Sequence, residues 1–311
     1  MKDVLFQALS SEIQLDVVTT EHRGHARELG ERARRDGLDL VCTLGGDGTV
    51  NEVVNGMLSA GPGDDVPRLA TIPGGSANVF ARALGLPAEP VEATGIILEA
   101  LREGRTRTIG LGLAAVTDAE AHRLPPRWFL ANAGLGLDAE IIAAMEDQRT
   151  AGKTATPARY LATTLRQYFL RTDRRDPALD VEVEGNAGEP AHRTATEIIP
   201  GVFLAIVQNT SPWTYLGGIA VQPCPSASFD AGLDLFAVRS LGIGASLRMA
   251  RRMLAGSTAG STKRSLTVLH DRPRLVVRAR RPTPLQIDGE GLGDVADVEF
   301  TSVPAALRAV V

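Results

Sequence analysis

Residues 42–58, CTLGGDGTVNEVVNGML, place three glycines and one aspartate between an apolar run and a helix-like pattern. The apolar run, residues 38–44, is short and shows no polar alternation, which is typical of a strand buried on both faces of a parallel sheet. The turn at the carboxyl end of such a strand is where α/β folds bind ligands. Glycine in this turn permits a positive φ and lets an anion approach backbone N–H groups. The stretch therefore predicts an α/β fold with a binding loop at residues 45–48.

The helix after this turn is predicted to begin near Thr49, which would cap it, and its N-terminus favours an anion. Asp47 would repel a phosphate, but a divalent cation that bridges the carboxylate and the phosphate removes the contradiction. A tight turn capped by Thr49 is the simpler interpretation of two glycines alone. The full string GGDGTVNEVVNG, with Asn51 and Glu52, contains more than a turn requires and favours a nucleotide site.

The patterns on both sides of this turn alternate between helix and strand and predict a parallel-sheet α/β domain over residues 1–105. Helices are expected over 2–10, 22–37, 50–58 and 76–86, and strands over 13–20, 38–44 and 68–73. Such a domain ordinarily opens with a strand, whereas this series opens with a helix. A first strand is therefore expected to be missing.

A second glycine turn, in IPGGSANVFARALGLP (residues 72–87), follows the next predicted strand. Gly74 and Gly75 make a sharp turn, and Ser76 and Asn78 can offer hydrogen bonds at the start of a helix. Two such loops at neighbouring strand ends would form two walls of one nucleotide crevice. Taken alone, this loop is explained equally well as a capped helix start.

The second part of the chain, residues 106–302, has a different pattern, with short predicted strands that turn residues separate. They cover 105–116, 127–137, 178–185, 201–210, 232–240, 274–281, 284–290 and 297–303. This series predicts a β-sandwich domain, interrupted by helices near 155–171 and 244–255. The C-terminal tail, residues 303–311, is expected to return to the first domain.

The bulk composition excludes several classes of protein. Hydrophobic residues make up 44% of the 311, which is typical of a globular chain. A net charge of −4 argues against a nucleic-acid binder. Cys42 and Cys224 lack metal-ligand spacing and are expected to be buried thiols. No apolar run reaches the roughly 18 residues of a membrane span, and the N-terminus lacks a signal-peptide core, so a cytoplasmic protein is predicted.

Both glycine loops, together with the ending PLQIDGEGLGDVADVEFTSVPAALRAVV, resemble the diacylglycerol kinase catalytic-domain family, which includes bacterial lipid kinases and sphingosine kinases and has an NAD kinase-like fold. The segments FLANAGLGLDAEI and QPCPSASFDAGLDLFAV also resemble segments of this family, so the resemblance covers nearly the whole chain. It implies a kinase of lipid metabolism and phospholipid biosynthesis that uses ATP and Mg²⁺ to phosphorylate the hydroxyl of diacylglycerol or a related lipid. The family's active site lies between an α/β nucleotide domain and a β-sandwich.

The resemblance also implies roles for single residues. Nucleotide contacts fall on Thr20, Gly45, Gly46, Asp47, Gly48, Thr49, Val50, Asn51 and Ser76. Glu290 takes the position of the general base, and Asp138 that of a contact to the lipid head group. Asp47 is expected to orient the metal and the phosphate, although it remains an alternative base. A DGE string by itself would be a solvated hairpin turn, and its pairing with the upstream loop favours the catalytic interpretation.

The chain departs from the family in three places. It begins after the family's first strand and phosphate loop. Two explanations are open: a start codon assigned too far downstream, or the loss of part of the nucleotide site. The first is favoured, because a helix without its strand would expose an edge of the core. Ala231 replaces a ligand of a structural Mg²⁺, which leaves Asp230 or Asp234 as candidates. Val79 replaces the aspartate that usually follows Asn78.

A lipid substrate requires peripheral docking on a membrane. The helix predicted near 155–171 gathers Tyr160, Leu161, Leu165, Tyr168 and Phe169 on one face, and Arg159, Arg166, Arg171, Arg174 and Arg175 supply charge toward anionic lipid. A helix packed on the sandwich explains the same pattern. Two rival functions stay open: a degenerate, non-catalytic member that binds lipid or nucleotide, and an NAD kinase. The sequence leaves both a monomer and a homo-oligomer open.

Overall fold

The computed structural model describes residues 2–136, 176–185, 196–216, 218–242, 244, 249, 251–253, 256, 261–263 and 265–311. The chain divides into two compact units. The first comprises residues 1–111 and 304–311, and the second comprises residues 112–303. The sequence predicted a boundary near residue 105 and a returning tail at residues 303–311.

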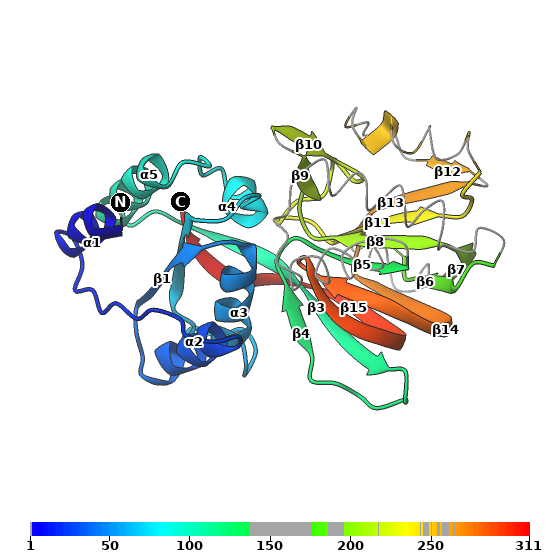
Figure 1. Ribbon diagram of the computed structural model, residues 1–311, viewed down its shortest axis with the longest axis horizontal. Coiled ribbons are helices and arrows are strands. Elements are labelled where there is room, and N and C mark those ends of the chain that lie inside the picture. The colour runs from blue at the N-terminus through cyan, green and yellow to red at the C-terminus, as the bar shows by residue number, and fades with distance from the viewer. Residues whose placement is uncertain are drawn as a thin grey trace. The chain divides into compact units, whose positions relative to one another are not determined.

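The first unit is an α/β fold around a small parallel sheet (Figure 1). Its elements are α1 (Lys2–Ser10), α2 (His25–Arg35), β1 (Leu40–Gly45), α3 (Asp47–Met57), β2 (Arg68–Pro73), α4 (Val79–Ala83) and α5 (Pro90–Glu103). β1 pairs with β2 in parallel, from Leu40 opposite Arg68 to Gly45 opposite Pro73. The end of β15 (Glu290–Val310) joins the other side of β2 in parallel, with Ala309 opposite Leu69. Both glycine turns consequently leave the sheet at the carboxyl ends of paired parallel strands.

The strand predicted over residues 13–20 is wrong. This segment has no regular secondary structure and no strand partner among the described residues, where β1 pairs with β2 alone. A strand is stable only when a neighbouring backbone satisfies its N–H and C=O groups. Val17 and Val18 are both about half exposed, at 48% and 51%, so the apolar pattern does not define a buried face.

The helices α2 and α3 pack against each other through glycines. An added Cβ on Gly56 would lie 2.0 Å from the Arg27 carbonyl oxygen, and one on Gly30 would lie 2.3 Å from the Val53 carbonyl oxygen. No side chain fits at these positions while the two backbones stay this close. Gly56, the last residue of the string GGDGTVNEVVNG, is therefore required for helix packing.

The second unit is strand-rich (Figure 1). Its strands are β3 (Thr106–Asp118, which begins in the first unit), β4 (Arg127–Phe129), β5 (Asn132–Gly136), β6 (Leu179–Val183), β7 (Glu197–Val202), β8 (Leu204–Gln208), β9 (Thr214–Leu216), β10 (Ile219–Val221), β11 (Leu233–Val238), β12 (Ser261–Lys263), β13 (Leu266–Arg272), β14 (Arg274–Ile287) and β15. The main sheet runs β15-β14-β5-β8-β11-β13-β12, and β9 and β10 form a separate pair.

The central strands β8 and β11 are buried on both faces. Successive residues of β8 join different hydrophobic clusters, with Ala205 and Val207 in one and Leu204 and Ile206 in the other. The same alternation holds along β11, which pairs with β8 in antiparallel register. Apolar layers therefore cover both faces of the sheet, and the predicted fold class, α/β followed by a β-sandwich, is confirmed.

Candidate active site

The two glycine turns of the first unit pack backbone against backbone. The Gly74 N–H donates to the Gly45 carbonyl oxygen at 2.8 Å. An added Cβ on Gly75 would lie 2.7 Å from the Gly46 Cα, and one on Gly74 would lie 3.1 Å from the Gly45 Cα. Gly46, Gly74 and Gly75 therefore allow the close approach of one loop to the other, whereas an added Cβ on Gly45 would meet the Thr49 side chain at 3.0 Å. The sequence predicted a sharp turn at Gly74 and Gly75 and room for an anion at the first loop.

Gly48 is different, because its surroundings are open. It is exposed, and an added Cβ would meet nothing within 4 Å. The helix α3 begins at Asp47 rather than near Thr49, and its N-cap, Gly46, provides no capping side chain. The N–H groups of Thr49 and Val50 both donate to the Gly46 carbonyl oxygen, at 3.0 and 3.2 Å. The first turn of an 11-residue helix therefore presents its positive end at an exposed glycine.

Asp47 joins the two loops. It is half-buried, and its Oδ1 accepts the backbone N–H of Phe80 in α4 at 3.0 Å. α4 is shorter than the predicted helix over residues 76–86, because the preceding residues form the turn itself. A carboxylate that uses one oxygen in this way keeps coordinating capacity for a cation, so Asp47 fits the predicted Mg²⁺ that accompanies a nucleotide.

Asn78 closes the second turn internally. Its backbone is left-handed, with φ +48°, and its side chain is buried. The Asn78 Oδ1 accepts the Gly75 N–H at 2.8 Å, and the Asn78 Nδ2 donates to the Gly75 carbonyl oxygen at 2.9 Å. Asn78 therefore shapes the loop, whereas its neighbour Ser76 is exposed.

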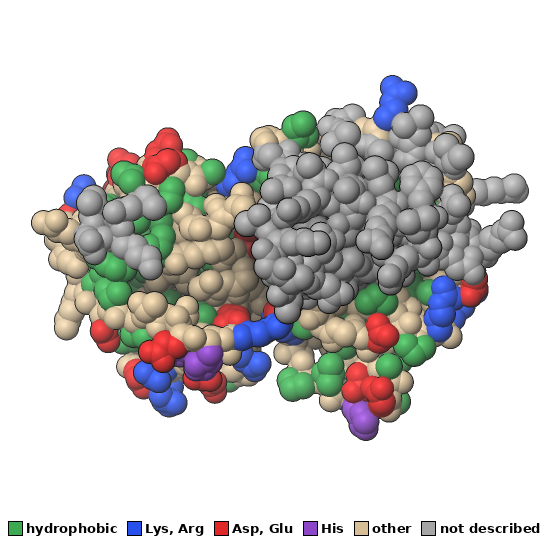
Figure 2. Space-filling view, viewed as in Figure 1, with side chains coloured by type: hydrophobic (Ala, Val, Ile, Leu, Met, Phe, Trp, Pro, Cys, Tyr) green, Lys and Arg blue, Asp and Glu red, His purple; other side chains and the backbone are tan. Residues whose placement is uncertain are grey.

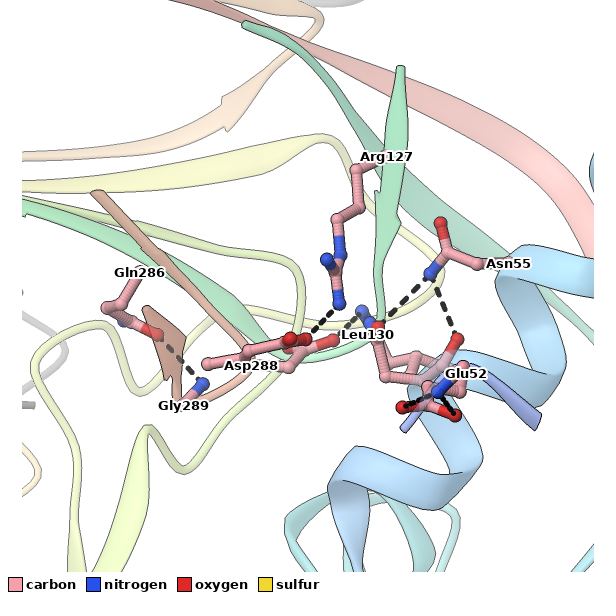
Figure 3. A network of polar contacts seen from close by, with 10 residues as sticks. Glu52, Asn55, Arg127, Leu130, Gln286, Asp288 and Gly289 are labelled. Atoms are coloured by element: carbon pink, nitrogen blue, oxygen red, sulfur yellow. Dashed lines mark hydrogen bonds and ion pairs between the residues drawn. The ribbon is translucent and has the colours of Figure 1, made fainter. Parts of the chain in front are cut away.

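The remaining predicted nucleotide contacts differ in accessibility. Thr20 is exposed on the extended segment, but the Val50 and Asn51 side chains are only 3% and 2% exposed. The Asn51 carbonyl oxygen and Oδ1 both accept from the Asn55 Nδ2, at 2.9 and 3.1 Å. Glu52 accepts the Gly24 N–H with both oxygens at 3.1 Å and so connects α3 to the start of α2 (Figure 3). The buried Asn51 and Asn55 thus stabilise α3 from within, whereas the half-buried Glu52 joins it to the start of α2.

A carboxylate holds the turn of the predicted DGE string in the second unit. Asp288 accepts three successive backbone N–H groups, from Leu130 at 2.7 Å, Ala131 at 2.9 Å and Asn132 at 3.0 Å. Figure 3 shows Leu130 beside Asp288. Its own N–H donates to the Asn132 carbonyl oxygen at 2.8 Å. The backbone of Asp288 is left-handed, with φ +46°. The three donor residues are buried, so the carboxylate replaces water as their hydrogen-bond acceptor.

Glu290, the predicted base, forms an ion pair with Arg127 through Oε2. Both side chains are 24% exposed, so the pair is partly shielded from solvent. Arg127 begins β4, where Ala114 of β3 lies opposite it, and Glu290 begins β15. The sequence did not predict a role for Arg127, because a single arginine before an apolar strand forms no recognisable motif.

Buried amides behind this turn form a polar layer that the sequence analysis also missed. Gln286 accepts the Gly289 N–H at 2.8 Å and donates to the Asn132 Oδ1 at 3.0 Å. Asn132 in turn donates to the Trp213 carbonyl oxygen at 3.1 Å. On the next strand, Gln208 accepts the Cys224 N–H at 3.0 Å. The layer fixes the turn to the segment that follows β8.

The described residues do not fit a structural Mg²⁺ at Asp230. This aspartate is exposed, and Ala231 beside it has no ligand atom. Asp234 is 1% exposed, and its Oδ1 accepts from His270 Nδ1 at 2.7 Å and from the Asp271 N–H at 3.1 Å. Burial raises the pKa of Asp234 above its ordinary value. The other carboxylate oxygen of Asp234, Oδ2, is buried without a hydrogen-bond partner. Mg²⁺ requires several oxygen ligands, and a single oxygen beside a histidine does not provide them.

The structure also bears on metal binding and on the two cysteines. In the described part of the chain, three carboxylate or imidazole side chains come close enough to hold an ion only at Asp118, Glu120 and His122, on a turn after β3. Burial raises the pKa of the Cys42 thiol to about 12, and that of Cys224 well above its ordinary value, so both stay protonated. Acidic and basic side chains are interspersed on the face of the described surface seen in Figure 2.

Asp138 and the docking helix predicted near residues 155–171 lie outside the described residues. The helices that the structure describes include none that is long and apolar enough to cross a membrane.

Comparisons with known proteins concern the family and the fold. Residues 3–114 match the profile of the diacylglycerol kinase catalytic domain. A diacylglycerol kinase of Bacillus subtilis is 27% identical over 307 residues, which cover 97% of this chain and 88% of that protein. One from Staphylococcus haemolyticus is 36% identical over 99 residues, 32% of this chain and 29% of its own.

A crystal structure titled as a diacylglycerol kinase from Bacillus anthracis superposes with a TM-score of 0.66 at 20% identity, over 97% of this chain and 87% of that one, which bears on the fold alone. Together, the matches confirm the predicted resemblance to the diacylglycerol kinase catalytic-domain family. They also support the prediction that the chain is a lipid kinase enzyme.

Proposed function

Starting from this chain's resemblance to the diacylglycerol kinase catalytic-domain family, we propose that it is an ATP- and Mg²⁺-dependent lipid kinase. Its substrate is the hydroxyl of diacylglycerol or of a related lipid. The observation that carries the proposal is the start of α3, where an exposed Gly48 and the half-buried Asp47 lie at an uncapped helix N-terminus. That arrangement supports binding of a polyphosphate together with a cation.

The nucleotide contacts belong to the first unit. The open start of α3 at the exposed Gly48 is assigned to the phosphate oxygens, and the hydroxyls of Ser76 and Thr20 are assigned further contacts. Asp47 would hold Mg²⁺, which neutralises charge on the transferring phosphate when bound. Gly45 and Gly46 fix the loop, whereas the burial of Val50 and Asn51 limits these residues to supporting α3.

The proton acceptor belongs to the second unit. The lipid hydroxyl oxygen forms a bond to the γ-phosphorus while the bond from that phosphorus to the bridging oxygen of ADP breaks, and ADP leaves with the electron pair. Glu290 takes the hydroxyl proton during this step, because an alcohol is a weak nucleophile while it keeps its proton. Asp138 is assigned to the lipid head group. Asp47 and Glu290 are thus assigned separate tasks, which are metal binding and proton acceptance.

The lipid is presented at a membrane surface, so the protein is proposed to be cytoplasmic and peripherally bound. Arg166, Arg171 and Arg174 supply the attraction to anionic lipid. Replacing all three with Gln should weaken vesicle binding by about 1 kcal/mol per charge, and less at high salt. Activity on a short-chain soluble lipid should barely change.

The function is tested by incubating the purified chain with γ-labelled ATP and, in separate reactions, diacylglycerol, sphingosine or NAD, each with Mg²⁺ or with EDTA. The proposal predicts label in the lipid product, lost with EDTA and reduced about 10²- to 10⁴-fold in Glu290→Gln. Label in NAD would support the NAD kinase alternative. ATP or lipid binding without transfer to any acceptor would support the degenerate, non-catalytic alternative.

A further inference from the structure

Arg127 and Glu290 lie on two chain segments that a second contact already holds together. The Asp288 carboxylate joins the segment of Leu130 to that of Glu290 through backbone hydrogen bonds of 2.7 to 3.0 Å. The Arg127–Glu290 ion pair joins the same two segments through side chains. Each contact restricts the geometry of the other, because few torsions separate Arg127 from Leu130 or Glu290 from Asp288.

The turn between these two contacts is itself rigid. Asp288 and Gly289 both have left-handed backbones, with φ +46° and +81°. The Gly289 N–H donates to the Gln286 Oε1, and the Gln286 amide is only 1% exposed. Ile287 and Glu290 then face each other as the first pair of the β14–β15 ladder. The backbone of Glu290 is therefore fixed, and its side-chain torsions remain to be restricted.

We propose that Arg127 is a positioning residue for Glu290. Its guanidinium contacts the Glu290 Oε2 and so holds the carboxylate in one orientation. This inference rests on the proposed function, since it assigns a task to Arg127 only if Glu290 is the base. Arg127 itself is not assigned a contact with the lipid or the nucleotide.

A second arginine–glutamate pair on the same sheet provides a control for a purely structural role. On the same sheet, Arg274 binds Glu299 with two contacts of 2.9 Å, and both side chains are more exposed, at 43% and 35%. Exposed pairs of this kind contribute about 0 to 1 kcal/mol to stability. Arg274→Gln is therefore a matched control, because it removes an arginine–glutamate pair from β14 and β15 away from the DGE turn.

The test measures turnover, ATP affinity and the thermal midpoint for the parent chain, Arg127→Gln, Arg127→Lys, Arg274→Gln, Glu290→Gln and the double variant Arg127→Gln/Glu290→Gln. Arg127→Gln should lose about 10- to 100-fold in turnover, the scale of a misplaced catalytic group, with ATP affinity within about threefold of the parent. Arg127→Lys, which keeps the charge, should recover part of this loss even if Arg127→Gln folds poorly. Arg274→Gln should match the parent in turnover.

The double variant gives the decisive comparison. If Arg127 acts only through Glu290, then adding Arg127→Gln to Glu290→Gln costs nothing further in turnover. Multiplied losses in the double variant, weaker ATP binding in Arg127→Gln, or parent-like turnover of Arg127→Gln would overturn the positioning role and leave the proposed function standing. A parent chain without any phosphoryl transfer would overturn both.

Discussion

The two loops assigned to chemistry are rigid for opposite reasons. In the first unit, Gly45 and Gly46 meet Gly74 and Gly75 with no side chain between the backbones. In the second unit, a single side chain, Asp288, fills the turn and accepts three N–H groups. The structure of the first loop is therefore disturbed by any added side-chain atom, whereas that of the second is disturbed by the loss of the Asp288 carboxylate.

This difference shows how each loop can serve its proposed ligand. Backbone packing leaves the start of α3 open at Gly48, where the proposal places the phosphates, because an added Cβ there would meet nothing within 4 Å. The carboxylate clamp instead fixes the direction in which the next side chain, Glu290, leaves the turn. The proposed binding loop and the proposed proton acceptor thus depend on different kinds of rigidity, which four substitutions can distinguish.

Replacing Asp288 with Ala should have the largest effect on stability. It leaves three buried N–H groups without an acceptor, at about 1 to 3 kcal/mol for each, so a loss of about 3 to 9 kcal/mol is expected. Chemical denaturation gives the free energy of unfolding directly. Asp294→Ala, on the exposed end of the same hairpin, is the control and should stay within about 0.5 kcal/mol of the parent. Equal values for the two variants would show that the clamp does not support the turn.

Asp47→Asn should leave the fold intact but reduce phosphoryl transfer by at least about 10²-fold. The asparagine oxygen can still accept the Phe80 N–H, while the charge that would hold Mg²⁺ is gone. Steady-state turnover at saturating ATP and Mg²⁺ measures the loss. Glu52→Gln, on the same helix, is expected to keep turnover within about twofold, since its carboxylate receives the Gly24 N–H. Near-parent turnover in Asp47→Asn would remove Asp47 from the mechanism.

Gly75→Ala should push the two glycine turns apart. Its new Cβ would lie 2.7 Å from the Gly46 Cα, and overpacking of this kind costs about 1 to 3 kcal/mol. ATP affinity, measured by calorimetry, should fall together with the thermal midpoint. An unchanged midpoint would mean that the loops separate easily and that their contact does not define the binding loop.

Gly48→Ala should have the smallest effect on stability, and it is the counterpart of Gly75→Ala. With nothing within 4 Å of the new Cβ, the helix should gain up to about 1 kcal/mol, because alanine is a better helix former than glycine. ATP affinity should still fall, since the methyl group covers the open start of α3. A variant that is more stable and binds ATP as well as the parent would show that phosphate does not approach Gly48.

The sequence predicted the features that recur as patterns. Alternating helix and strand patterns identified most elements of the first unit, and the glycine motifs identified both turns. The strand predicted at residues 13–20 failed because partner strands, which no local pattern reveals, decide whether an extended segment pairs. The start of α3 was misplaced by two residues because Gly46 caps it without a side chain.

Contacts between segments far apart in the chain could not be predicted. Arg127 and Glu290 are separated by 163 residues, and Asp288 reaches back over a similar span to Leu130. The buried amides Asn132, Gln208 and Gln286 lie in apolar strands, where a lone polar residue has no periodicity to mark it. The motif DGE identified the position of the turn, while the structure supplied the reason for its aspartate.

We propose that nucleotide binding and proton acceptance are separate tasks of the two loops. ATP affinity, measured by calorimetry, and lipid turnover on the same preparation of Glu290→Gln test this separation. ATP affinity should stay within about threefold of the parent while turnover falls about 10²- to 10⁴-fold. Much weaker ATP binding, or parent-like turnover, would show that the tasks are not separate and would move the search for the base to Asp47 or Asp138.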